Sequence, residues 1–122
     1  METITSQDLE TLAILQTARR ILRTEDHWCK DNYVMNERGQ QTTQGADDAF
    51  AYCLDGALAR AAREVTGTWD MVERKDPARK LLAATMPKRY SGVIGFNDAK
   101  STTHIMVLNL IDEAIERVGV HS

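Results

Sequence analysis

TSQDLETLAILQTARRIL, residues 5–22, is the stretch of sequence that decides the fold. Thr5 and Asp8 have the spacing of a helix capping box, in which two side chains each bond the other residue's backbone amide. Apolar residues then recur at helical spacing and arginines fall on the opposite side. The pattern predicts an amphipathic helix over about 6–26. Its expected buried stripe is Ile14, Leu15, Ala18, Ile21 and Leu22.

A second helix is expected from near Ala46 to just before Gly67, because Asp47 and Asp48 suit the positive first turn of a helix. Its alanines make it thin, and Gly56 in its interior costs stability, so another element is expected to cross it closely. Its expected inward stripe is Phe50, Cys53, Leu54, Ala57, Leu58, Ala61 and Val65.

Two shorter patterns predict the remaining helices. Asp76 and Pro77 suit an N-cap and a first-turn proline, and this third helix is expected to end at Met86, ahead of Pro87. The last helix is expected to begin near 101–102 and to stop at Gly119. The expected core residues of the two helices are Leu81, Leu82, Val107, Leu108, Ile111, Ala114, Ile115 and Val118.

A short β-hairpin is expected between the first two helices. Residues 33–35 and 40–43 flank a turn in which Asn36 and Gly39 hold the first and last positions. A lone two-stranded hairpin is marginal in water, so Trp28 and Tyr33 are expected to anchor it on the helices.

The segment from Ser91 to Lys100 is rich in glycine and polar residues and is expected to be a loop. Its anchors into the core are expected to be Val93, Ile94 and Phe96. No repeat or linker appears, so the sequence predicts a mainly α fold, a single domain over 1–122 with four helices and a short β-hairpin between helices 1 and 2.

Composition and charge narrow the class of protein. The 122 residues are 43% hydrophobic and 27% charged with a net charge of −3, which is typical of a globular protein and argues against a surface made wholly for nucleic acid. No signal peptide or apolar run of about 20 residues appears, so a cytoplasmic protein that does not engage a membrane is expected. The two cysteines, Cys29 and Cys53, are expected to be reduced thiols.

Three motifs together resemble a known family. They are Trp28-Cys29, the run from Ala49 to Leu58 with its Cys-Leu-x-Gly-Ala-Leu pattern, and Phe96-Asn97-Asp98. The chain resembles an uncharacterised family of small helical proteins from bacteria and bacteriophages. The resemblance implies a helical or nearly helical single domain, often carried by phages or mobile elements. It implies no activity and no catalytic residue.

Reactive side chains permit two chemical hypotheses. Cys29, Cys53, His27 and His104 are the residue types that bind zinc, although no Cys-x-x-Cys or His-x-x-x-His pair places two ligands on one element. Cys29 with His104, oriented by Asp98, is a conceivable nucleophilic pair, but no oxyanion loop or nucleophile elbow accompanies it. The structural alternative is that Cys53 belongs to the core and that Cys29 is half-buried. We therefore predict no catalytic residue, metal or cofactor.

Two polar features are candidate binding surfaces. Asn97 and Asp98 precede a helix and are suited to contact a partner or ligand, although the same residue types commonly satisfy their own backbone in turns. The second feature is a basic strip, countered nearby by Asp70, Glu73 and Asp76, and its alternative is a solvated face of mixed charge. The basic strip is Arg74, Lys75, Arg79, Lys80, Lys88 and Arg89.

These features favour a small non-enzymatic interaction or regulatory protein. The resemblance suggests a phage or mobile-element protein that binds a host protein, such as a component of a defence system. The alternative is a nucleic-acid-binding accessory protein that uses the basic strip, residues 74–89. A third hypothesis is an enzyme or metalloprotein that uses Cys29 and Cys53 or Asn97 and Asp98. No oligomeric state follows from the sequence.

Overall fold

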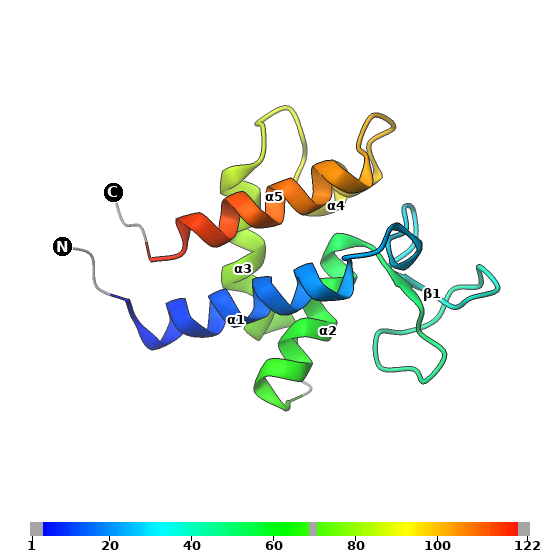
Figure 1. Ribbon diagram of the computed structural model, residues 1–122, viewed down its shortest axis with the longest axis horizontal. Helices are drawn as coiled ribbons and strands as arrows, with labels where there is room; N and C mark the ends of the chain where they lie inside the picture. The colour runs from blue at the N-terminus through cyan, green and yellow to red at the C-terminus, as the bar shows by residue number, and fades with distance from the viewer. Residues whose placement is uncertain (1–3, 69–70, 120–122) are drawn as a thin grey trace.

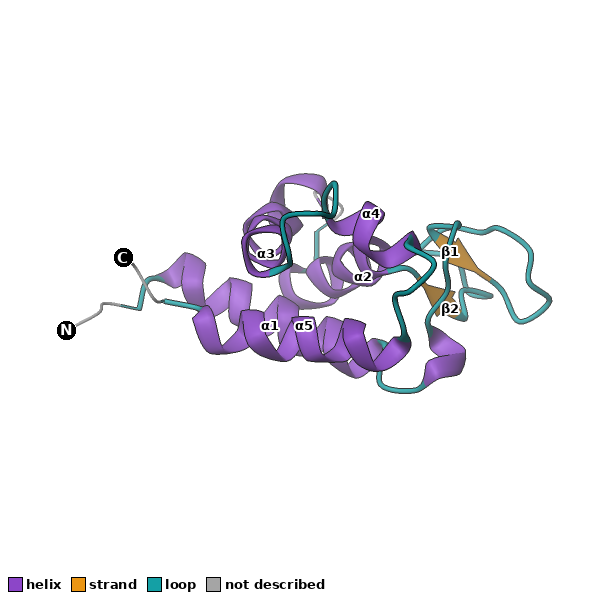
Figure 2. Cartoon of the chain, turned by 90° about the horizontal axis from the view of Figure 1, so that it is seen from above, coloured by secondary structure: helices purple, strands orange, loops and turns teal. Residues whose placement is uncertain are grey.

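The computed structural model describes residues 4–68 and 71–119, and most of them are helical (Figure 1). Figure 2 shows α1 and α5 in one layer, α2, α3 and α4 in the other, and the two strands at one end. This arrangement confirms a mainly α fold with four long helices and a short hairpin, to which α4 adds one short helix. In chain order the elements are α1 (Ser6–Ile21), the 3-10 helix η1 (Glu25–His27), β1 (Val34–Met35), β2 (Ala51–Tyr52), α2 (Leu54–Thr66), α3 (Met71–Thr85), α4 (Val93–Asp98) and α5 (His104–Arg117).

Helix α1 begins as predicted and ends earlier. The capping box is present: Asp8 N–H donates to Thr5 Oγ1 and Thr5 N–H donates to Asp8 Oδ2, both over 3.0 Å. The predicted end at Asp26 is wrong, because the helix stops at Ile21. The carbonyl of Leu22 contacts His104 Nε2 of α5 at 2.6 Å, so a side chain of another helix occupies the end of α1.

The hairpin precedes α2 as predicted, but most of its second strand comes from a different segment. Val34 pairs with Tyr52 and Met35 with Ala51 in antiparallel register. The expected partner, residues 40–43, contributes only an isolated bridge from Gln41 to Met35. The predicted turn is present, because Gly39 N–H donates to the carbonyl of Asn36. Trp28 and Tyr33 pack against the helical core as predicted.

Helix α2 starts at Leu54, and the predicted start near Ala46 is wrong. Phe50 and the β2 residues pair with β1 instead, so their backbone amides are not available to a helix. Cys53 is the N-cap, and its Sγ accepts a hydrogen bond from Gly56 N–H at 3.2 Å. The helix ends at the expected glycine, Gly67, which has a left-handed φ of 71°.

Helix α3 begins at Met71, so the predicted start at Asp76 and Pro77 is wrong and Pro77 lies inside the helix. The preceding turn stays helical while Lys75 turns into the protein and reaches Asp55 of α2. The proline signal alone did not predict the helical turn that precedes Pro77. The contact between Lys75 and Asp55 lies in that turn.

The last part of the chain departs from the prediction in two places. Residues 93–98 form α4 rather than a loop, beginning after Gly92, whose φ is 107° and whose carbonyl accepts from Phe96 N–H. Helix α5 begins at His104 instead of at 101–102, because Thr103 is the residue whose side chain caps it.

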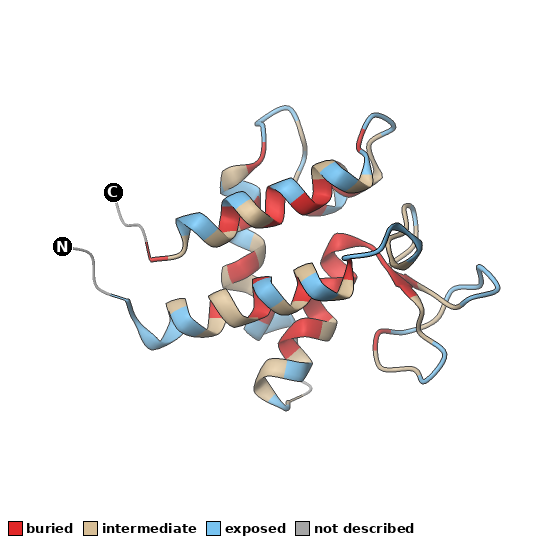
Figure 3. Cartoon of the chain, viewed as in Figure 1, coloured by how far each residue is buried: buried red, intermediate tan, exposed pale blue. Residues whose placement is uncertain are grey.

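The core is built from residues of both helical layers and of the hairpin. Figure 3 shows buried positions along α1, α2, α3 and α5. Val93 and Phe96 are buried as predicted, but the prediction for Ile94 is wrong, since that side chain is 48% exposed. No helix in the described ranges has both the length and the apolar composition needed to cross a membrane. The fully buried large apolar residues are Ile14, Leu15, Leu22, Val34, Leu54, Leu58, Leu82, Val93, Val107 and Ile111.

Gly56 is where the predicted close crossing occurs, because a Cβ there would overlap the backbone carbonyl oxygen of Tyr33. We expect Gly56→Ala to lower the free energy of unfolding by about 1–3 kcal/mol, despite the better helix propensity of alanine. Gly95→Ala is the matched control, since its Cβ would meet only the side chain of Ser91, whose Oγ can rotate away. Urea unfolding followed by circular dichroism measures both, and equal stability of the two variants would contradict the prediction.

Candidate functional site

The three sequence motifs meet at the side chain of Asn97 in α4. Asn97 is 0% exposed, and its Oδ1 accepts hydrogen bonds from Trp28 Nε1 at 2.7 Å and Leu54 N–H at 3.0 Å. Its Nδ2 donates to the carbonyl of Cys29 at 3.0 Å and to Asp98 Oδ1 at 2.9 Å. One amide therefore joins the segment after α1, the start of α2 and the end of α4. The Asn97 side chain is buried and bonds three segments of the chain to one another. It is therefore not part of the surface that a partner could contact.

Asp98 lies at the outer edge of this network. Its Oδ1 also accepts from Asp31 N–H at 2.9 Å, which fixes a residue with a left-handed φ of 66°. Next to Asp31, Lys30 Nζ donates to the carbonyl of Ala99 at 2.7 Å. Asp98 is thus the member of the predicted pair that reaches the surface.

A small cavity of about 180 Å³ opens beside Asp98. Tyr33 and Cys53 form part of its wall, and the exposed Ile94 stands at its edge. We call this surface the α4 face. Its lining residues are Asp31, Asn32, Tyr33, Gln41, Cys53, Ile94 and Asp98.

The two cysteines are held as neutral thiols. Burial raises the pKa of Cys29 to about 12, and Cys53 and Asp98 push it in the same direction. Burial likewise raises the pKa of Cys53 to about 11. A nucleophilic or zinc-binding cysteine acts as a thiolate, which these surroundings disfavour.

We expect both thiols to react slowly in the folded protein. At pH 9 a thiol with a pKa of 11 is about fiftyfold less ionised than an ordinary one, so alkylation by iodoacetamide should be slower than that of a cysteine peptide by at least that factor. Because these pKa values are raised on folding, the neutral thiols contribute to the free energy of unfolding below pH 9. That contribution is lost as the pH rises through about 11 and 12. The prediction is contradicted when the folded protein is alkylated as fast as a cysteine peptide and unfolding it in urea does not increase the alkylation rate.

The histidines of the metal and nucleophile hypotheses serve other contacts. His27 Nδ1 bonds the carbonyl of Phe50 at 2.6 Å, and His104 Nε2 bonds the carbonyl of Leu22. His104 also lies against the Trp28 ring, with 6.1 Å between ring centroids. In residues 4–68 and 71–119, no three His, Cys, Asp or Glu side chains gather in a way that suits a metal ion.

The basic strip does not form one uniform cationic surface. Lys75 is buried, and its Nζ bonds Asp55 Oδ2 at 2.9 Å and Tyr33 Oη at 3.1 Å. Burial alone would lower the pKa of Lys75, but these two hydrogen bonds outweigh it and raise that pKa. Arg79 Nε lies 3.5 Å from Asp55 Oδ1, so Lys75 and Arg79 share the carboxylate of Asp55.

The outer members of the basic strip also have partners. Arg74 pairs with Glu10 of α1 at 3.3 Å and Lys80 with Asp76 at 3.0 Å. The Arg89 guanidinium lies over the Tyr90 ring at 4.8 Å. Of the six cations, Lys88 is exposed and its side chain forms no hydrogen bond or ion pair with the described residues. Asp70, one of the countering acids, lies outside the described residues.

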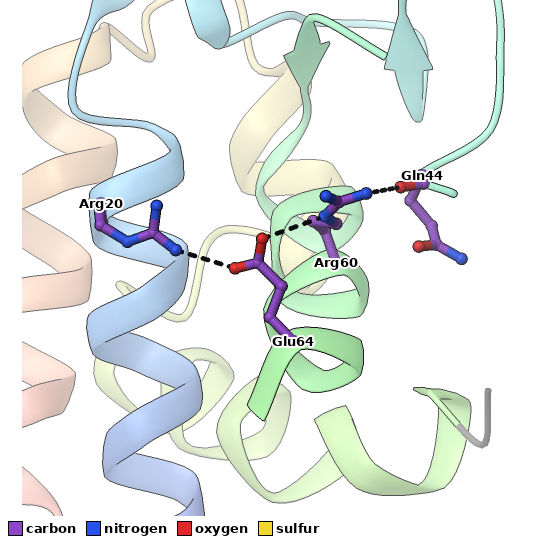
Figure 4. Close-up of polar contacts among 4 residues, drawn as sticks. All are labelled: Arg20, Gln44, Arg60 and Glu64. Carbon is purple, nitrogen blue, oxygen red and sulfur yellow. Dashed lines mark hydrogen bonds and ion pairs between the residues drawn. The ribbon is translucent and has the colours of Figure 1, made fainter. Parts of the chain in front are cut away.

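A different cluster of arginines was not predicted from the sequence. Arg20 of α1 and Arg60 of α2 both bond the carboxylate of Glu64, at 2.9 and 3.3 Å (Figure 4). The sequence placed the α1 arginines in water without relating them to α2. The signal that was present is the i, i+4 spacing of Arg60 and Glu64, which marks an ion pair but not its third member.

A comparison with protein families adds one finding. Residues 6–117 match the model of a family of unknown function, DUF6197. The chain belongs to the DUF6197 family. Neither the curated proteins nor the solved structures contain a match to the chain. The DUF6197 match runs from α1 to the end of α5, so the Asn97 network, the α4 face and the arginine cluster all lie inside the family region. The expected likeness to an uncharacterised family is confirmed at that level.

Proposed function

We propose that this DUF6197 protein is a non-enzymatic interaction or regulatory protein that binds another protein through the α4 face. Its source in a phage or mobile element, and a host protein such as a defence-system component as its partner, rest on the sequence resemblance. The binding surface rests on the geometry around Ile94 and Asp98.

The observation that carries the proposal is an exposed isoleucine beside a cavity that fits a side chain. Sites for small molecules commonly enclose about 300–1,000 Å³, whereas the cavity below Ile94 measures about 180 Å³. Protein interfaces depend largely on a few anchoring side chains that enter well-packed pockets surrounded by polar groups. Asp31 and Asp98 supply such a polar rim. We therefore expect a basic or polar side chain of the partner to enter beside Ile94.

The two other hypotheses find less support. The third hypothesis needs thiolates or a free Asn97 side chain, but the cysteines have raised pKa values and Asn97 is buried in hydrogen bonds. Nucleic-acid binding by the basic strip needs cations that face solvent together, and Lys75 points into the protein beside Asp55.

The test compares two isoleucines in equivalent positions. Ile94 and Ile105 are each the second residue of a helix and are 48% and 60% exposed. A protein captured from a bacterial lysate is purified, and its dissociation constant is measured by calorimetry with the wild type and both variants. We expect Ile94→Asp to weaken binding at least about tenfold, as for an anchor residue, and Ile105→Asp to leave it unchanged. Equal affinities of all three proteins, or turnover of a substrate by the wild type, would overturn the proposal.

A further inference from the structure

The arginine cluster lies in a cleft on the side of the molecule where α1, η1, β2 and α2 meet. The cleft measures about 440 Å³, which is within the usual range of small-molecule sites. Three arginines and one glutamate line it, leaving two positive charges in excess on a chain whose net charge is −3. We call it the arginine cleft. Its lining is Arg20, Ile21, Arg23, Thr24, His27, Ala49, Phe50, Tyr52, Arg60 and Glu64.

The arginines are held in place with donors to spare. Figure 4 shows the Glu64 carboxylate between the guanidinium groups of Arg20 and Arg60, each of which bonds one of its oxygens. Arg60 is fixed further by a hydrogen bond from Nη1 to the carbonyl of Gln44 at 3.1 Å. A guanidinium has five N–H donors, so Arg20 and Arg60 keep unused donors after these bonds. Two oriented guanidinium groups in one cleft suit a phosphate, which accepts such forked donors.

Arg23 differs from its neighbours because its side chain forms no hydrogen bond or ion pair with the described residues; its backbone N–H donates to the carbonyl of Arg20. It lies just beyond α1, one turn from Arg20, and is exposed. An exposed arginine without a counter-ion is the group that an incoming anion meets without breaking an existing contact.

Aromatic rings also line the arginine cleft. The rings of His27 and Phe50 lie 4.6 Å apart, and the His27 ring is oriented by the bond from Nδ1 to the carbonyl of Phe50. That carbonyl is an acceptor, so Nδ1 carries a proton and Nε2 is left for another contact. Aromatic faces beside arginines are the arrangement on which nucleic-acid bases stack.

We propose that the arginine cleft binds a nucleotide, with the phosphate at Arg20, Arg23 and Arg60 and the base against His27 and Phe50. This ligand is separate from the protein partner of the α4 face, because the two sites share no lining residue. The nucleotide is either free in solution or the terminal nucleotide of a single strand, since both present the same phosphate and base.

The test uses calorimetry of the full chain with four probes: adenosine triphosphate, adenosine, inorganic phosphate and a 5′-phosphorylated single-stranded hexanucleotide. Arg23→Gln removes a charge without breaking a side-chain hydrogen bond or ion pair among the described residues. Arg117→Gln is the matched control, because Arg117 is an exposed arginine at the end of α5 whose side chain likewise forms no ion pair within residues 4–68 and 71–119. We expect Arg23→Gln to weaken binding of the nucleotide by about tenfold or more and Arg117→Gln by less than about twofold. The affinity should also fall as salt is raised.

Each outcome decides the proposal. Binding of the triphosphate with loss in Arg23→Gln supports it with a free nucleotide as ligand, and the same loss with the hexanucleotide alone supports it with a strand terminus. Adenosine or inorganic phosphate binding as tightly as the triphosphate would overturn it, because the site would then not recognise phosphate and base together. Equal losses in Arg23→Gln and Arg117→Gln, or no binding by any probe, would also overturn it.

Discussion

Replacing Asp55 with asparagine is expected to lower the free energy of unfolding by about 3–5 kcal/mol. The side chains of Asp55 and Lys75 are only 7% and 11% exposed, and Lys75 Nζ lies 2.9 Å from Asp55 Oδ2. The variant keeps the size of the side chain but leaves the Lys75 ammonium buried without its counter-charge. Arg79 loses the same partner. Urea unfolding at neutral pH measures the loss.

Two further variants test the cause of that loss. Asp76→Asn makes the same chemical change at an exposed pair with Lys80, where the cost should be at most about 1 kcal/mol. In the double variant Asp55→Asn with Lys75→Met, the stranded charge is absent, so part of the stability should return. The prediction is wrong when Asp55→Asn costs no more than Asp76→Asn, or when the added Lys75→Met change lowers stability further.

Features that depend on nearby residues were predictable from the sequence. The capping box of Thr5 and Asp8 forms within one turn, and Gly67 ends α2 because it adopts a left-handed conformation at little cost. The apolar spacing of α5 likewise identified Val107 and Ile111 as core residues. Each of these signals is decided by the chain within a few residues.

Features that depend on distant residues were not predictable in the same way. The two aspartates after Ala46 resemble a helix start, but β1 pairs with 51–52 and moves the start of α2 to Leu54. Lys75 appeared as one member of a cationic strip, yet its partner Asp55 lies 20 residues earlier and draws it inside. A single sequence gives the charge of Lys75 and not the fold that buries it.

The arginines of α1 illustrate the same limit at the candidate binding sites. Their helical spacing predicted one solvated face, but Arg19 pairs with Asp112 of α5 while Arg20 pairs with Glu64 of α2. Two consecutive arginines of α1 thus form ion pairs with two different helices. The arginine cleft became visible only once the position of α2 relative to α1 was known.

Replacing Asn97 with alanine is expected to cost about 3–5 kcal/mol, because it strands several buried polar groups at once. Leu54 N–H and Trp28 Nε1–H lose their acceptor, and the carbonyl of Cys29 loses its donor. Within residues 4–68 and 71–119, these three groups have no hydrogen-bond partner other than Asn97. Asn109→Ala, at an exposed asparagine of α5, is the matched control and should change stability by less than about 0.5 kcal/mol.

A double-variant cycle with Trp28→Phe separates the network from simple loss of packing. Trp28→Phe removes the indole donor, so in the wild type it breaks the 2.7 Å bond to Asn97, whereas in Asn97→Ala that bond is already absent. We therefore expect Trp28→Phe to cost less in the Asn97→Ala background, with a coupling of about 1 kcal/mol. The measurement is urea unfolding of the four proteins. Strict additivity would mean that the two side chains stabilise the fold independently, and Asn97 would then not be the point at which the three motifs are joined.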